Sequence, residues 1–351
     1  IRDRSYSVKG RFENLAVNAV DTFPGVSGLT GSIEGTQDGG TLVIAGRNAT
    51  FELGRIFRAP LAFATVEARA KWRHEGRALE VNIEEAAVAN PDVAASFAGT
   101  WRSLPDARVK SPGYLDLKGA FTRGNTARTA DYLPNGIAGT REWLERSLQG
   151  GQLVRAKFEL KGDLYEFPFG PGSNGHFLFE GDVRDARLRF HPAWPAIDAI
   201  DGTFRFENRR MEILSAAAGI FGSRVRSASA VVEDMSQNPP VLVFDADIDT
   251  TAADTTRYLR ESPLANGPGA FTRAVSIEGP ARFKMRLSYP FYGTDPLRVQ
   301  GDFLFAGATA TVGRNLAMRE IKGQLTFTER GIRAPGPVSY THLTLPTNRE
   351  V

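Results

Sequence analysis

The sequence predicts a mainly β protein: a long antiparallel sheet of repeated hairpins, curled into an open apolar groove, with two or three short helices. Two observations predict this class. The heptapeptide Gly175–Gly181 returns 126 residues later as Gly301–Gly307, and internal repeats indicate a chain that grows by adding units. Between the repeats, apolar and charged residues alternate with a period of two, as in strands whose two faces meet different surroundings.

The repeat can be traced beyond this heptapeptide. Three further segments recur in the same order, 132–133 as 258–259, 167–169 as 289–291, and 200–206 as 321–327. A partial copy also precedes them. We therefore expect four regions: a first partial repeat with inserted strands at 1–125, a second repeat that begins with a short helical segment at 126–250, a third partial repeat at 251–337, and a non-native tail at 338–351. The tail resembles translated sequencing-adapter read-through and breaks the strand rhythm.

Alternation is clearest near residue 285, where apolar Phe283, Met285 and Leu287 are interleaved with Arg282, Lys284 and Arg286. This pattern is typical of an antiparallel sheet that is wetted on one side. Glycines recur in the strands, often 19 to 22 residues apart, at Gly10, Gly31, Gly119, Gly162, Gly181, Gly202, Gly279, Gly301 and Gly323. Glycine inside a strand commonly marks a bulge or bend, so these positions predict a consistent curl. The pattern leaves open whether one sheet forms a groove or two sheets form a sandwich.

Two short helices are expected. Thr140 is predicted to cap a helix that runs through Leu148 and stops at Gly150, because threonine is a favoured N-cap and glycine a favoured C-terminal stop. A second helix is expected near Thr251 to Glu261, before Pro263.

Composition excludes several function classes. The net charge is only +3, with 43 basic and 40 acidic residues interspersed, so no nucleic-acid partner is expected. The chain has no cysteine, which excludes disulfides, thiolate metal ligands and a cysteine nucleophile. No apolar run reaches the roughly 18 residues of a membrane span, and the start without Met, in mid-strand, suggests an internal fragment of a longer protein.

The sequence gives only weak signals of metal, phosphate or catalytic sites. Asp245, Asp247 and Asp249 share one strand face; we interpret them as a solvated outer face rather than a calcium site. The histidines lack zinc-ligand spacing, and the glycine-rich stretch 36–41 lacks the lysine of a phosphate loop. No catalytic residue, metal or cofactor is therefore expected. The alternating arginines, Arg282 and Arg286 and also Arg187 and Arg189, are interpreted as a solvated strand face, with binding of lipid headgroups or anionic partners as the alternative.

Several motifs together resemble one family of bacterial envelope proteins. They are Tyr132-Leu133-Pro134, Arg141-Glu142-Trp143-Leu144, Gly162-Asp163-Leu164, Phe167-Pro168-Phe169 and Trp194-Pro195. In this order they resemble the YhdP branch of the AsmA-like proteins of Gram-negative bacteria. The resemblance implies a middle section of a periplasmic protein, anchored to the inner membrane by an N-terminal helix absent here, whose curled apolar sheet carries phospholipid towards the outer membrane. It implies possible partners on the outer-membrane side and no catalytic residues.

The phenylalanines supply the candidate site. The chain has 23 Phe and only 8 Tyr, so rings are placed where no hydroxyl is wanted. Candidate groove-lining residues are Phe158, Leu160, Phe177, Phe179, Phe204, Phe206, Phe244, Phe283, Met285, Leu287, Phe303, Phe305, Leu325 and Phe327. We hypothesise a non-enzymatic lipid conduit that shields acyl chains and maintains the outer-membrane barrier. The alternatives are a dry core, an envelope scaffold or assembly factor that binds client β-strands, and a glycan-processing enzyme.

Overall fold

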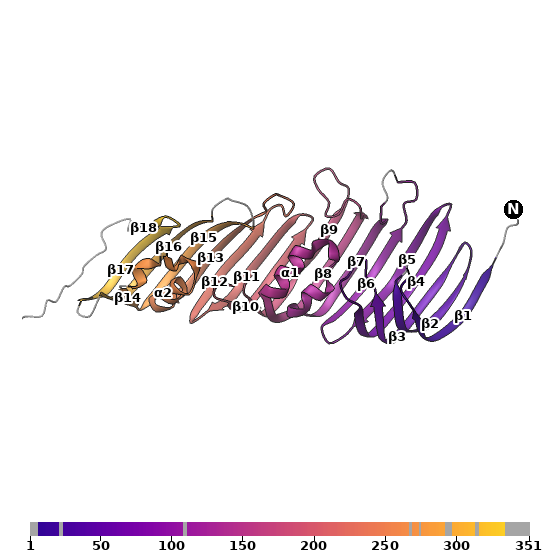
Figure 1. Ribbon diagram of the computed structural model, residues 1–351, viewed down its shortest axis with the longest axis horizontal. Coiled ribbons are helices and arrows are strands. Elements are labelled where there is room, and N and C mark those ends of the chain that lie inside the picture. The colour runs from indigo at the N-terminus through magenta and orange to yellow at the C-terminus, as the bar shows by residue number, and fades with distance from the viewer. Residues whose placement is uncertain are drawn as a thin grey trace, which may run out of the picture. The chain divides into compact units, whose positions relative to one another are not determined.

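The computed structural model in Figure 1 describes residues 6–20, 24–107, 111–266, 269–273, 275–291, 297–312 and 316–333. The chain forms two compact units. Unit 1 comprises Ile1–Ala186 and Thr203–Arg210, and unit 2 comprises Arg187–Gly202 and Met211–Val351. The expected tail 338–351 lies outside the described residues, and the expected repeat boundaries remain a prediction.

The expected fold class is confirmed as mainly β, with antiparallel hairpins and short helices. Eighteen strands lie within the described residues: β1 (Ser7–Val17), β2 (Gly25–Thr36), β3 (Gly39–Glu52), β4 (Leu61–Glu75), β5 (Ala78–Ala89), β6 (Val93–Arg102), β7 (Tyr114–Asn125), β8 (Leu148–Asp163), β9 (His176–Leu188), β10 (Ile197–Glu207), β11 (Arg210–Ile220), β12 (Ser223–Val232), β13 (Val241–Thr251), β14 (Val275–Glu278), β15 (Pro280–Pro290), β16 (Arg298–Val312), β17 (Leu316–Thr328) and β18 (Gly331–Arg333).

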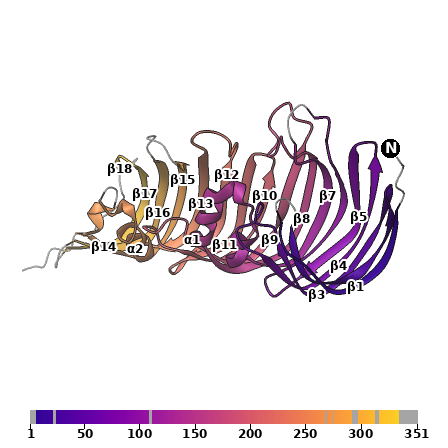
Figure 2. The same ribbon diagram turned by 45° about the vertical axis from the view of Figure 1, so that its right-hand side comes forward.

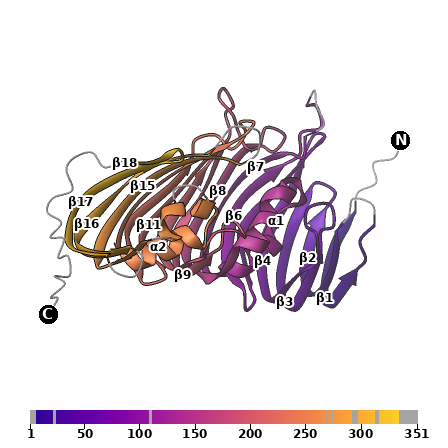
Figure 3. The same cartoon turned by 60° about the vertical axis from the view of Figure 1, so that its left-hand side comes forward.

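The helical residues gather in two segments. The first holds the 3-10 helices η1 (Thr126–Tyr132) and η2 (Asn135–Ile137) and the α-helix α1 (Ala138–Ser147); the second holds α2 (Ala252–Arg260), η3 (Pro263–Asn266) and η4 (Ala270–Arg273). Figure 3 shows α2 in front of strands of unit 2, where it contacts β13 and β14. Among the described residues, no helix is long and apolar enough to cross a membrane.

The expected second helix is confirmed, and the expected cap of the first helix is wrong. Thr251 caps α2, since its hydroxyl oxygen accepts a hydrogen bond from the Asp254 amide at 3.0 Å. In contrast, α1 begins at Ala138 after Ile137, and no side chain caps it. Thr140 therefore lies inside the first turn. The reason is that η2 leads directly into α1, so the chain is already helical where a cap would stand.

Unit 1 contains one sequential antiparallel ladder. Each strand from β1 to β8 pairs with the next strand in the chain, and Figure 2 shows these strands side by side in that order. Consecutive hairpins make this the arrangement of lowest contact order for a large sheet. The ladder makes all of these strands part of one sheet, and the side chains of alternate residues share a face.

Unit 2 follows the same pairing rule with one interruption. Strands β11, β12, β13, β15, β16, β17 and β18 pair antiparallel in that order, and the short β14 pairs with β16 beyond the end of β15. Gly279 separates β14 from β15 with a φ of +110°, a conformation that favours glycine. Here the expected glycine bend is found.

At Gly119 and Gly301 the expected bulge is wrong. The ladder runs through Gly119 and Gly301 without a register shift. Instead, a Cβ at Gly119 would collide with the ring of Phe97, and a Cβ at Gly301 would collide with the ring of Phe327. Each glycine thus lies beneath an aromatic ring from the neighbouring strand, and its missing side chain lets the ring lie low on the sheet.

Buried apolar side chains of the described residues gather in three clusters, two of which include a residue of a helical segment. In unit 1, Tyr132 of η1 packs against a buried cluster that includes Leu29, Phe63, Val66 and Val93. In unit 2, Ala252 of α2 forms a buried cluster with Ala281 and Phe303. A second cluster of unit 2 is formed by Ala218, Val225, Ala246 and Ile248.

Candidate functional site

Aromatic rings contact one another across five strands of unit 1, edge to face from β6 to β9 and tilted at β10. Phe97 of β6 lies 5.7 Å from Phe121 of β7, and Phe121 lies 5.5 Å from Phe179 of β9 (ring centroids). Phe158 of β8 lies 6.0 Å from the second ring of β9, that of Phe177. The row reaches β10, because Phe179 lies 5.0 Å from Phe204, and that ring lies 5.9 Å from Phe206. Such pairs contribute about 0.5–1.5 kcal/mol each beyond their buried area.

The strand register explains why these rings share one face. Phe158 pairs with Gly119, Leu160 pairs with Leu117, and Gly119 in turn pairs with Phe97. Directly opposed residues in an antiparallel ladder project to the same side. The same rows continue through unit 1 with apolar residues, for example Val81 with Trp72, and Leu42 with Ile33. We call this the apolar face of unit 1.

The other face of the unit 1 sheet is charged. Cross-strand ion pairs join Arg73 to Glu80 at 2.9 Å, and Lys161 to Asp116 at 2.8 Å. Hydrogen bonding to Asp116 raises the pKa of Lys161. Exposed pairs of this kind stabilise little, but they keep that face solvated.

Unit 2 repeats the division into two faces. Phe283 pairs with Phe303 and Phe303 with Leu325, while Met285 pairs with Gly301 and Gly301 with Phe327. Opposed residues again share a side, which brings together the eight predicted residues of this unit, Phe244, Phe283, Met285, Leu287, Phe303, Phe305, Leu325 and Phe327. We call this the apolar face of unit 2. The rings of Phe283 and Phe327 stack with centroids 5.3 Å apart.

The aspartates on β13 face the arginines of β15. Arg282 donates to Asp247 at 2.7 Å, and Arg286 lies 3.5 Å from Asp245. The hydrogen bond from Arg282 holds the pKa of Asp247 below its usual value, against the opposing effect of desolvation. Among the described residues, no group of three or more His, Cys, Asp or Glu could hold a metal ion.

Exposure separates these faces from an ordinary core. Of the fourteen predicted lining residues, only Phe303 and Phe327 are buried, at 9% and 8% exposure, and the other twelve are half-buried. A phenylalanine in a closed hydrophobic core is usually fully covered. The contiguous, partly exposed apolar surface of each unit is the kind of surface that marks a binding site.

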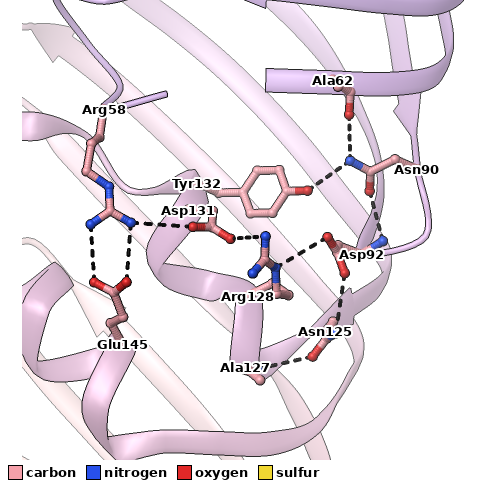
Figure 4. A network of polar contacts seen from close by, with 10 residues as sticks. All are labelled: Arg58, Ala62, Asn90, Asp92, Asn125, Ala127, Arg128, Asp131, Tyr132 and Glu145. Atoms are coloured by element: carbon pink, nitrogen blue, oxygen red, sulfur yellow. Dashed lines mark hydrogen bonds and ion pairs between the residues drawn. The ribbon is translucent and has the colours of Figure 1, made fainter. Parts of the chain in front are cut away.

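The first helical segment is fixed to unit 1 by the polar network drawn in Figure 4. Arg58, in the β3–β4 loop, lies 3.2 Å from Glu145 of α1 and 3.7 Å from Asp131 of η1. Asn90, in the β5–β6 turn, donates to the Tyr132 hydroxyl at 2.9 Å. The hydrogen bond from Arg58 lowers the pKa of Glu145. We call residues 126–147 the strap, because they run from the end of β7 back to the β3–β4 loop.

The family model for YhdP proteins matches residues 1–347. The chain belongs to the YhdP family. The resemblance inferred from the sequence motifs is thereby confirmed. The matched residues include 338–347, which belong to the segment expected to be a non-native tail.

The chain is similar to an Escherichia coli (strain K12) protein named intermembrane phospholipid transporter YhdP. It is 25% identical over 294 residues, which is 81% of this chain and 22% of the relative. The chain thus spans about a fifth of the relative's length. No solved structure matches the chain.

Some members of the apolar face in this YhdP-family chain were not predicted. Phe97 and Phe121 lie in the aromatic row of unit 1, and the alternation of Leu115, Leu117, Gly119 and Phe121 could have identified the strand face. Phe169 was also missed as a buried residue: it is only 1% exposed. The Phe167-Pro168-Phe169 motif does not indicate this burial, because the ring of Phe169 lies against Gly162 and Gly175, which lie outside the motif.

Proposed function

We propose that this chain is a non-enzymatic section of a lipid conduit, in which the apolar face of each unit forms a groove that shields phospholipid acyl chains. The observation that carries the proposal is the half-buried row of apolar side chains on one face of each sequential sheet. The name of the E. coli relative supports phospholipid as the cargo.

The physical need for such a surface follows from acyl-chain hydration. Exposing one CH₂ group to water costs about 0.8 kcal/mol, so a chain of about sixteen carbons faces a barrier of roughly 12 kcal/mol. Half-exposed phenylalanines lower this barrier, because they offer a surface on which the chain stays out of water. No bond is made or broken, so the function requires no catalytic group.

The cellular setting belongs to the same proposal. We place the chain in the periplasm of a Gram-negative bacterium, within a longer protein anchored to the inner membrane, where it carries phospholipid to the outer membrane and maintains the outer-membrane barrier. Proteins on the outer-membrane side are proposed partners. Family membership supports this setting.

A charge on the apolar face tests the proposal. Met285→Asp places a carboxylate on the apolar face of unit 2, opposite Gly301, where an unpaired ion costs several kcal/mol to cover with acyl chains. The matched control is Ser288→Asp, which adds the same charge to the polar side of the same strand, opposite Arg298. Transfer of labelled phospholipid between inner-membrane and outer-membrane fractions is measured with the full-length protein.

We expect Met285→Asp to fold and to reduce transfer at least about tenfold, a change that corresponds to about 1.4 kcal/mol, while Ser288→Asp transfers normally. A folded Met285→Asp protein with unchanged transfer contradicts the proposal. An unfolded Met285→Asp protein beside a folded control indicates a closed core in place of a groove.

A further inference from the structure

Arg141 of α1 is a buried cation. The residue is only 9% exposed, whereas Glu142, Trp143 and Arg146 of the same helix are exposed. Half-buried Leu144 lies one turn further along the same side. Arg141 is therefore on the inward side of the strap, whose Tyr132 packs onto the apolar cluster of unit 1.

The guanidinium of Arg141 is only partly satisfied. One terminal nitrogen, Nη1, donates to Asn135 Oδ1 at 3.1 Å. The Nε atom is buried and has no hydrogen-bond partner in the described part of the chain. An arginine has five N–H donors and no acceptor, so a single carboxamide leaves most of its donors unused.

Two carboxylates of the strap, Glu145 and Asp131, pair with other arginines. Glu145 pairs with Arg58 at 3.2 Å, and Asp131 pairs with Arg128 at 2.7 Å. The charge of Arg141 contributes less to the lowered pKa of Glu145 than the hydrogen bond and the charge of Arg58 do. Within residues 6–333, as far as these are described, Arg141 forms no ion pair with a carboxylate. A buried cation in that state normally requires a compensating anion.

We propose that Arg141 binds the phosphate of a phospholipid whose acyl chains lie on the apolar face of unit 1. The inference rests on the proposed function and adds a headgroup site to it. The planar guanidinium presents a fork of donors that matches phosphate oxygens. The strap that carries Arg141 packs through Tyr132 onto the apolar cluster of unit 1, so a lipid whose chains cover the rest of that face can place its phosphate beside Arg141.

The test measures lipid occupancy beside Arg141 in the full-length protein. Benzoylphenylalanine at Leu144 reports local occupancy through the yield of photo-crosslinked lipid as lipid concentration rises. The probes are dioleoylphosphatidylglycerol, dioleoylglycerol, which lacks phosphate, and soluble glycerol 3-phosphate as a competitor. The variants are Arg141→Met and, as matched control, Arg146→Met, since Arg146 is exposed and donates to the backbone of its own helix at Glu142.

We expect Arg141→Met to raise the half-saturating concentration of the phospholipid about tenfold, with dioleoylglycerol unaffected and Arg146→Met unchanged for both. The inference is overturned if Arg141→Met and wild type have the same half-saturating concentration of phospholipid. It is also overturned if Arg141→Met raises the half-saturating concentrations of both lipids equally, because Arg141 then has a structural role. Soluble glycerol 3-phosphate is also added at the half-saturating concentration of the phospholipid. If it lowers the yield of crosslinked phospholipid, the site binds a free phosphate ester, and the inference is overturned.

Two outcomes separate this site from the conduit itself. Wild-type protein that crosslinks neither lipid contradicts the proposed function and the headgroup site together, whereas crosslinking without preference for phosphate contradicts the site alone. Far-UV circular dichroism and the melting temperature identify a misfolded Arg141→Met protein. In that event Arg141→Lys carries the comparison, with an expected shift of about threefold, because lysine keeps the charge and loses the fork.

Discussion

Gly119→Ala adds a single methyl group beneath the aromatic row of unit 1. The new Cβ would collide with the ring of Phe97 and lie 2.9 Å from the carbonyl oxygen of Ser96. The ring can move, but the backbone oxygen is held in the ladder between β6 and β7. The substitution therefore lifts Phe97 from the sheet or separates the two strands.

The magnitude follows from the contacts of that ring. Phe97 lies 5.7 Å from the ring of Phe121 and 6.3 Å from the ring of Phe158, and inserting a methyl group into such packing costs about 1–3 kcal/mol. At roughly 2–4 °C per kcal/mol for a unit of this size, we expect the unit 1 melting transition to fall by about 2–12 °C.

Thermal unfolding followed by circular dichroism measures the change. Gly10→Ala is the matched control, because Gly10 also lies in a strand of unit 1, opposite Ile33, and a Cβ there meets nothing within 4 Å. Equal melting temperatures for Gly119→Ala and Gly10→Ala would refute the idea that the strand glycines make room for rings.

Three further predictions concern stability. Phe169→Ala should cost about 3–5 kcal/mol of unfolding free energy, because the ring is only 1% exposed; a loss below about 1 kcal/mol in chemical denaturation would show that the site collapses without cost. Tyr132→Phe removes the hydroxyl that accepts from Asn90 and should cost about 0.5–1.5 kcal/mol, measured by the same denaturation, with no change if water replaces the bond. Because Arg282 lowers the folded-state pKa of Asp247, its contribution is complete above the ordinary aspartate pKa and is lost as the pH falls through the lowered value. Asp247→Asn should therefore flatten the acid limb of unfolding free energy against pH, and an unaltered limb contradicts the assignment.

Sequence reasoning succeeded where the information is local. The alternation of Phe283, Met285 and Leu287 assigns all three to one strand face, because side chains alternate with a period of two. The cap of α2 is also a local feature, since Thr251 and the Asp254 amide that it binds are three residues apart. Neither inference requires knowledge of a distant partner.

The remaining features depend on contacts between distant residues. That Gly119 lies beneath Phe97 follows from the register of two strands, which local patterns do not specify. The half-exposed state of Phe158 depends on what covers the sheet, and alternation is the same in a groove and in a sandwich. That Glu145 pairs with Arg58, which lies 87 residues earlier in the chain, and not with Arg141 depends on the tertiary fold. A short stretch of the sequence therefore does not determine any of these features.

Site-specific lipid crosslinking tests the central claim most directly. Phe179 and Leu178 are adjacent, apolar and both half-buried, but they project to opposite faces of β9. Benzoylphenylalanine is placed at each position in turn in the full-length protein, and phospholipid adducts are quantified after irradiation in cells. Adducts at Phe179, with at least about a tenfold lower yield at Leu178, are the result that acyl-chain shielding by the apolar face predicts. Equal yields at the two positions, or adducts at Leu178 alone, would contradict it.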